Sequence, residues 1–132
     1  MSTRSAIIVK TGDQEFIGVY CHYDGYTEGV GKTLNEHYQD HEKVVSLVSL
    51  GSLSVLAERV APVGEHSFRN PEDGTTIAYH RDRDEELHVC KGRSVIEVAE
   101  QIGHNGYVYS FEDGKWSVNG ISLKEELAEL DA

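Results

Sequence analysis

The hydrophobic pattern at the start of the chain predicts a β-hairpin. Apolar residues fill positions 6–9, and after a polar break apolar and polar residues alternate over positions 15–22. Side chains alternate between the two faces of a strand, so Cys21 falls on the apolar face and Tyr20 and His22 on the other. We therefore expect Cys21 in the core and a polar-aromatic face that leads into an Asp-Gly turn.

A period of three to four residues predicts helices in the next part of the chain. Residues 28–38 carry one apolar stripe despite their glycines. Asp40 is placed to cap a second helix that ends at Gly51, because a short side-chain oxygen satisfies exposed N–H groups at a helix start. Residues 52–57 then predict a third, short helical turn before the first proline.

The middle of the sequence mixes loop and strand signals. Both prolines lie in residues 61–74, which predicts a loop within one domain rather than a linker. Residues 75–80 predict a strand, and the charged run at 81–86 predicts a solvated loop or strand end. Ser94 and Glu97 have the spacing of a capping box, which predicts a helix that stops at the following glycine.

The last third gives the clearest local signals. Residues 107–118 have the pattern strand, Asp-Gly turn, strand. Residues 121–132 predict an acidic C-terminal helix that begins with a capping box of Ser122 and Glu125. Its single leucine stripe needs a surface to pack on, which is either the protein's own domain or a partner subunit.

These elements predict an α+β fold. We expect an antiparallel sheet built from hairpins, packed against several short helices, with an amphipathic helix at the C-terminus. The 132 residues suit one domain, which we assign to residues 1–120, with residues 121–132 as the packing helix.

Charge and cysteine content limit the kinds of partner and site that we expect. The chain has 23 acidic and 12 basic residues, a net charge of −11, which repels nucleic acid and anionic membranes at long range. We therefore expect neither as a direct partner, although an acidic protein can also imitate a nucleic acid. Two distant cysteines argue against a disulfide framework and a thiolate zinc site. The composition predicts a cytoplasmic protein, in a host cell if the gene is viral.

Three kinds of chemistry are weakly supported by the sequence. Residues 29–33 end like a phosphate-binding loop, but its first glycine is one position too far away, so Lys32 is left only as a contact for an anion. His37 and His41 have the spacing of two metal ligands on one helix, but a helix that starts after Asp40 would separate them. No nucleophile has a recognised signature beside it. We predict no catalytic residue, no metal and no cofactor.

A recognition surface is better supported. Tyrosines in the aromatic turn (residues 20–26) offer flat faces on which a nucleobase can stack. Guanidinium groups match phosphate oxygens, and several arginines fall at strand ends or in loops, with surface ion pairs as their alternative role. These arginines are Arg4, Arg69, Arg81 and Arg83.

The same residues carry a resemblance to a family of small phage and prophage proteins. Its members open with a Thr-Arg strand, here Thr3-Arg4, and have a Tyr-x-His-aromatic-Asp-Gly-Tyr turn, here residues 20–26. The resemblance also covers three later segments, residues 65–68, 79–84 and 107–116.

Within that family the chain is similar to the Thoeris anti-defence proteins. These sponges bind a cyclic ADP-ribose isomer without cleaving it, so that the host immune effector is not triggered. The resemblance implies a phage-encoded protein that sequesters a cyclic ADP-ribose isomer or a cyclic oligonucleotide. We expect it to form a homo-oligomer whose interfaces build the pocket. The matching positions are Arg4, Tyr20, His22, Asp24 and Tyr26, to which the residue chemistry adds Lys32, Arg81 and Arg83.

Two other functions stay open at this point. The first is an acidic protein inhibitor that imitates nucleic acid and blocks a host restriction or CRISPR-type defence protein, which requires the acids at 82–86 and 125–131 to form one face. The second is a phosphodiesterase that cleaves the same nucleotides. Asp24 likewise has two readings, as a partner for ribose hydroxyls or as a residue that only fixes the turn.

Overall fold

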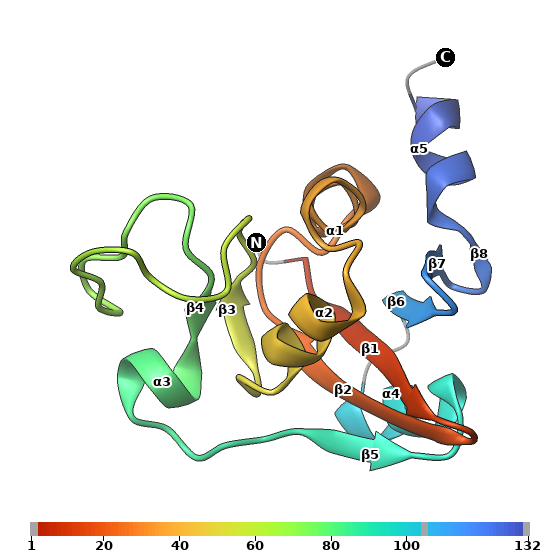
Figure 1. The fold of residues 1–132 in the computed structure, drawn as a ribbon, viewed down its shortest axis with the longest axis horizontal. Helices are drawn as coiled ribbons and strands as arrows, with labels where there is room; N and C mark the ends of the chain where they lie inside the picture. Colours follow the sequence, from red (N-terminus) through yellow and green to blue (C-terminus); the bar gives the residue numbers. More distant parts are fainter. Residues whose placement is uncertain (1–2, 104–105, 131–132) are drawn as a thin grey trace.

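The computed structural model describes residues 3–103 and 106–130, and these form a sheet with helices on both faces. The path of hydrogen-bonded strands is β4-β3-β2-β1-β6-β7-β8, and β5 also pairs with β2. Helix α2 lies in front of β1 and β2 in Figure 1, and α4 lies behind them. The expected α+β class is confirmed.

The described elements have the following bounds. The strands are β1 (Ser5–Gly12), β2 (Glu15–Cys21), β3 (Leu53–Val55), β4 (Ile77–Ala78), β5 (Cys90–Gly92), β6 (Tyr107–Glu112), β7 (Lys115–Val118) and β8 (Ile121–Ser122). The helices are the π-helical turn η1 (Thr27–Gly31), α1 (Lys32–His37), α2 (His41–Val48), α3 (Tyr79–Arg83), α4 (Val95–Ile102) and α5 (Leu123–Leu130).

The expected hairpins β1–β2 and β6–β7 form, but two other strand pairs are parallel. Strand β1 pairs antiparallel with β2 on one side and parallel with β6 on the other. Strand β2 pairs parallel with β3 through Cys21 and Leu53. The sheet is therefore mixed, and the parallel pairs place the end of β2 beside β3, which is where the candidate site lies.

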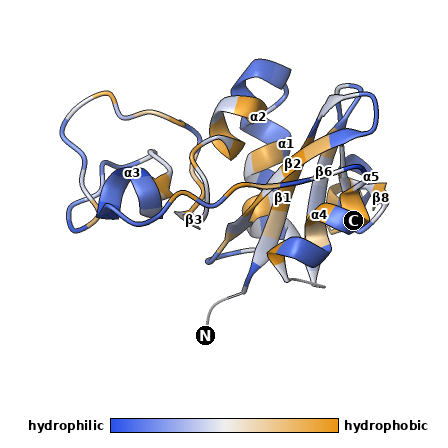
Figure 2. Cartoon of the chain, turned by 90° about the horizontal axis from the view of Figure 1, so that it is seen from below, coloured by the Kyte–Doolittle hydropathy of each residue, from blue (hydrophilic) through white to orange (hydrophobic). Residues whose placement is uncertain are grey.

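Each face of the sheet has its own core. The larger core includes Ile7, Val19 and Cys21 from the strands and is covered by the helices η1, α1, α2 and α5. The smaller core includes Ile8 and Phe16 and is covered by α4. Figure 2 shows hydrophobic residues along the central strands, while α3 is mostly hydrophilic. The predicted inward direction of Cys21 is confirmed, because its exposed fraction is 0%.

The helix starts follow the predicted capping chemistry. The side chain of Asp40 accepts a hydrogen bond from the Lys43 N–H, so α2 begins at the next residue as expected. Ser94 accepts from the Glu97 N–H, and α4 ends at Gly103, whose φ of 79° is easily adopted only by glycine. Both helix starts and the end of α4 are confirmed, whereas α2 ends at Val48, before the expected Gly51.

Two predictions about the middle of the chain are wrong. Residues 52–57 do not form a helical turn, because the backbone of Leu53 pairs with both β2 and β4. The strand predicted at 75–80 is reduced to Ile77–Ala78, and residues 81–83 of the charged run belong to helix α3, whereas residues 84–86 form the exposed loop that was expected. The carboxylate of Asp82 reaches back to accept from the Ala78 N–H at 2.8 Å, which favours a helix start there.

The C-terminal helix packs at its first turn and is exposed at its last. Leu123 is fully buried, and α5 contacts η1, α1 and β7. Leu130 is 51% exposed. Within the ranges given above, no helix is both long enough and apolar enough to cross a membrane.

A buried hydrogen bond ties β6 to the aromatic turn, and we predict that removing it destabilises the fold. The Tyr109 hydroxyl donates to the Gly25 carbonyl at 2.7 Å, and the ring is fully buried. Tyr109→Phe leaves that carbonyl without its donor, which costs about 1–3 kcal/mol in the free energy of unfolding. Urea denaturation measures the loss. Tyr23→Phe, on a ring that is 45% exposed, is the control and should change stability little.

Candidate functional site

The carboxylate of Glu72 makes several hydrogen bonds within and beside the loop at residues 61–74. Glu72 accepts hydrogen bonds from the N–H groups of Val63 at 3.0 Å and Gly64 at 2.7 Å, and from the Thr75 hydroxyl. These bonds lower the pKa of Glu72 to about 2, the Thr75 hydroxyl contributing most. A long loop without helix or strand is therefore ordered by charge-assisted hydrogen bonds rather than by apolar packing.

A second carboxylate fastens this loop to α3. The side chain of Asp82 is 4% exposed, and its Oδ2 lies 3.1 Å from Nε2 of His66, whose side chain is 2% exposed. Nδ1 of His66 accepts from the Glu72 N–H at 3.0 Å, so a neutral His66 ring carries its proton on Nε2, facing Asp82. The contact is close but is not aligned as a hydrogen bond. It joins the loop directly to the helix.

Arg81 is the third member of the group that attaches the loop to α3. We call Asp82, Arg81 and His66 the fastening cluster. Its guanidinium donates to both oxygens of Asp82, at 2.8 and 3.0 Å, and to the carbonyls of Val60 and Thr76, each at 2.6 Å. Burial alone would raise the pKa of Asp82, but bonds from Arg81 and the Ala78 N–H, with the His66 contact, hold it below its usual range. Asp82 is therefore a charged structural centre.

The fastened loop and α3 face the aromatic turn across a cleft of about 400 Å³. This volume is within the range of small-molecule sites. One side of the cleft comes from the aromatic turn and the other from the loop and α3. The lining residues are His22, Tyr23, Ser54, Phe68, Ile77, Tyr79 and Arg83. We call this the aromatic cleft.

Aromatic rings dominate both sides of the aromatic cleft. The rings of His22 and Tyr23 meet edge to face with centroids 4.5 Å apart. Opposite them, the rings of Phe68 and Tyr79 lie 5.8 Å apart. The Arg83 guanidinium sits over both of these rings, 4.9 Å from the Phe68 centroid and 5.3 Å from the Tyr79 centroid, a cation–π arrangement. Flat apolar faces and one cation thus share a single opening.

Phe68 and Arg83 also border a second hollow of about 410 Å³. Its other lining residues are Ser67, Arg69 and Asp82. Because Asp82 is already paired with Arg81, the cations that this hollow presents at its edge are Arg69 and Arg83. A ligand in the aromatic cleft would therefore have a basic border next to it.

Four of the residues predicted from sequence, Tyr20, His22, Tyr23 and Arg83, come together here. His22 and Arg83 line the aromatic cleft from opposite sides. Tyr20 does not line it but is hydrogen bonded through its hydroxyl to Nδ1 of His22. Burial raises the pKa of Tyr20, with the Arg4 charge acting in the opposite direction, so Tyr20 stays a neutral hydroxyl at physiological pH.

The remaining residues predicted in the turn lie beside the aromatic cleft rather than in its lining. Arg4 is exposed just before β1, where its backbone runs against Gly25. Asp24 has a φ of 58°, and its carbonyl accepts from the Val30 N–H at 2.8 Å. The Tyr26 hydroxyl donates to the Asp24 carboxylate at 3.4 Å. These contacts give Asp24 the role of fixing the turn.

Two predicted residues lie elsewhere. Lys32 is the exposed first residue of α1 and is outside the lining of the aromatic cleft. Arg81 donates four hydrogen bonds within the fastening cluster, so its guanidinium is committed to the loop and helix. We therefore leave both out of the candidate site.

Four lining residues were not predicted from sequence. Ser54 and Ile77 come from strands whose pairing the pattern did not reveal. Phe68 and Tyr79 lie in two of the segments, 65–68 and 79–84, that share the family resemblance. The resemblance was therefore the available signal for Phe68 and Tyr79. Segments that are distant in the sequence but resemble the same family can form one surface.

The alternatives based on nucleophiles and metals gain no geometric support. Burial raises the pKa of the Cys21 thiol to about 12, which leaves almost no thiolate at neutral pH. His41 contacts the Lys10 carbonyl, whereas His37 lies near Glu36 and Glu58. In the described part of the chain, no group of three or more histidine, cysteine or acidic side chains is arranged to hold a metal ion.

Comparison of the chain with protein-family models, with curated proteins and with solved structures finds no match. The family resemblance therefore stays a prediction from the residues that carry it.

We predict that Glu72 makes the loop sensitive to acid. Its pKa is 4.5 ordinarily and about 2 in the folded protein, so its stabilising effect is complete above pH 4.5 and is lost as the pH falls towards 2. Glu72→Gln should lower the urea midpoint at pH 7 and reduce the fall of that midpoint between pH 4.5 and 2. It should also speed proteolysis within residues 61–74.

The control for this prediction is Glu129→Gln, which removes one exposed carboxylate from α5. It makes the same change in net charge without touching the loop. Equal effects of the two substitutions on proteolysis of the loop would contradict the role of Glu72.

Proposed function

We propose that this protein binds a nucleotide-derived immune signal in the aromatic cleft and sequesters it without cleaving it, as a phage-encoded anti-defence protein. The observation that carries the proposal is the joint placement of His22, Tyr23, Phe68, Tyr79 and Arg83 around one opening. A cyclic ADP-ribose isomer or a cyclic oligonucleotide offers the matching parts, a flat base and phosphates.

The physical chemistry of the aromatic cleft suits such a ligand. A base that stacks on an aromatic side chain gains about 1–3 kcal/mol, by analogy with single-stranded nucleic acids. Phe68 and Tyr79 offer ring faces, and the Tyr23 ring is 45% exposed. Arg69 at the neighbouring hollow can donate to phosphate oxygens, and so can Arg83 when a phosphate replaces Glu85 as its partner.

Pre-organisation supports binding as well. The contacts of Asp82 with Arg81 and His66 join the loop that carries Phe68 to the helix that carries Tyr79, so less backbone freedom is lost when a ligand enters. The Tyr20 hydroxyl similarly restrains the His22 ring on the other side. Tight binding without chemistry requires such a rigid and complementary site.

The distribution of acidic residues favours this proposal over the nucleic-acid mimic. The mimic requires the acids of α3 and α5 to form a continuous face. In both views the two helices lie at opposite ends of the molecule (Figures 1 and 2). Asp82 is also buried, and Glu85 is paired with Arg83. The charges are therefore spread over separate surfaces.

Calorimetry with cyclic ADP-ribose isomers and cyclic oligonucleotides tests the proposal. We expect heat of binding at micromolar protein for at least one of them. Phe68→Leu and Arg83→Gln should each weaken that ligand about tenfold, which corresponds to about 1.4 kcal/mol of lost stacking or phosphate contact. Mass spectrometry of the ligand released by heating should find it intact.

Arg93→Gln is the matched control, because Arg93 is an exposed arginine between β5 and α4, outside the lining of the aromatic cleft. It should leave affinity unchanged. Absence of heat with every nucleotide would refute the proposal, and a cleaved product whose formation a chelator abolishes would identify a phosphodiesterase instead.

A further inference from the structure

On the face of the sheet that carries α4, no other helix of residues 3–103 and 106–130 covers β6 and β7. Helix α4 packs on β1, β2 and β5. The same face continues over β6 and β7, where register places Ser110 opposite Ser117. Their side chains are small, so the sheet beside α4 is hollowed rather than filled.

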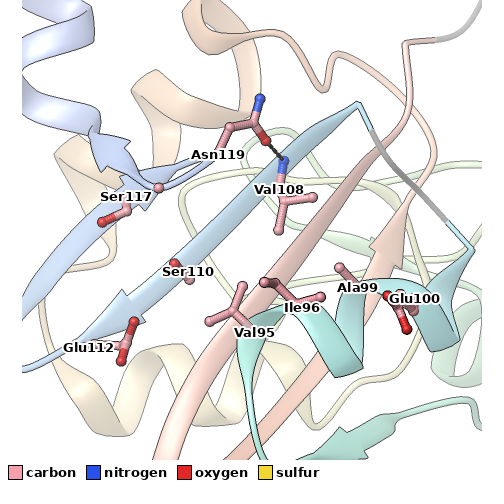
Figure 3. A pocket seen from close by; sticks show the side chains of 10 residues that line it. Val95, Ile96, Ala99, Glu100, Val108, Ser110, Glu112, Ser117 and Asn119 are labelled. Carbon is pink, nitrogen blue, oxygen red and sulfur yellow. Dashed lines mark hydrogen bonds between the residues drawn. The ribbon is translucent and has the colours of Figure 1, made fainter.

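This region forms a groove of about 580 Å³, shown in Figure 3. Val95 and Ile96 of α4 border one side, and the side chains of β6 and β7 lie across from them. Ile96 is 72% exposed although it is apolar. The complete lining is Val95, Ile96, Ala99, Glu100, Val108, Ser110, Glu112, Ser117, Asn119 and Gly120. We call this the α4 groove.

The α4 groove runs alongside a helix. Its lining comes from α4 on one side and from β6, β7 and the turn that follows β7 on the other, and its volume is about 580 Å³. Helices that pack side by side have axes about 8–10 Å apart. A helix that packs next to α4 would therefore cover β6 and β7 on this face of the sheet. Helix α2 helps to cover the opposite face.

The charge of the α4 groove indicates what kind of helix fits. Among the described lining residues the ionisable groups are Glu100 and Glu112, and both are acidic. Lys115 pairs with Glu112 in the strand register, but it is exposed and does not line the groove. The lining combines the apolar side chains of Val95, Ile96 and Val108 and small serines with two carboxylates, which complements an amphipathic helix with lysine or arginine beside its apolar stripe.

We propose that the α4 groove docks a basic amphipathic helix of a partner protein. The α5 helix of a second copy is a poor occupant, because its residues Leu123–Leu130 include three glutamates and one lysine, which the groove carboxylates repel. This docking surface is separate from the aromatic cleft and does not depend on nucleotide binding. It gives the protein a means of attachment to a second macromolecule.

A designed peptide tests the docking surface on the intact protein. The probe is an amphipathic peptide of about 14 residues, or four helical turns, with leucines on one face and lysines on the other. We expect it to bind and to shift the NMR amide signals of Val108, Ser110 and Ser117. The same peptide with glutamates in place of lysines should bind at least about tenfold more weakly.

Matched charge variants separate docking from general attraction to an acidic protein. Glu100→Gln with Glu112→Gln should weaken the lysine peptide about fivefold or more, since both lost charges lie in the groove. Glu125→Gln with Glu129→Gln makes the same change in net charge on α5 and should have a much smaller effect. Ile96→Ser should also weaken binding, whereas Phe68→Leu in the aromatic cleft should not.

Several results would overturn the proposal. These are absence of binding, equal effects of the two charge pairs, or signal shifts confined to residues outside the α4 groove. Analytical ultracentrifugation provides a further check, because self-association that Ile96→Ser abolishes would make a second copy the occupant.

Discussion

The buried carboxylate of Asp82 holds together the half of the molecule that forms the aromatic cleft. Its bonds to Arg81 and the Ala78 N–H, and its contact with His66, join the start of α3 to a loop that has little apolar packing of its own. Loss of one member of such a buried pair generally costs about 3–5 kcal/mol, because a charge is left uncompensated. This cluster joins the two segments that carry Phe68 and Tyr79.

The aromatic cleft and the α4 groove illustrate two different ways to build a surface on one sheet. The cleft lies where β2 ends beside β3, and its walls are segments that polar contacts hold in place. The groove lies over β6 and β7, where regular strands carry small side chains and no helix covers them in the described ranges. Walls held by polar contacts suit the recognition of a small molecule such as a nucleotide. A wide, open groove suits a larger partner such as a helix.

Local signals in the sequence predicted those parts of the fold that depend on local chemistry. Asp40 and Ser94 were recognised as caps because an N-cap bond spans only three residues. Strand β3 was missed because its pairing depends on β2 and β4, which no short window contains. The candidate site divides in the same way. His22 was found from its motif, whereas Arg81 was interpreted as a ligand contact because its partner at Val60 lies 21 residues away in the sequence.

The parallel pair of β1 with β6 has a consequence for how the chain reaches this fold. Ser5 pairs with Tyr107 at one end of the ladder and Val9 with Phe111 at the other, so the central strand finds one of its neighbours about a hundred residues away. Contacts of such long range are slow to form, because most of the chain must be closed into a loop first. During synthesis the β1–β2 hairpin therefore emerges long before its sheet can be completed, and its open edge must stay unpaired until the last quarter of the protein has been made.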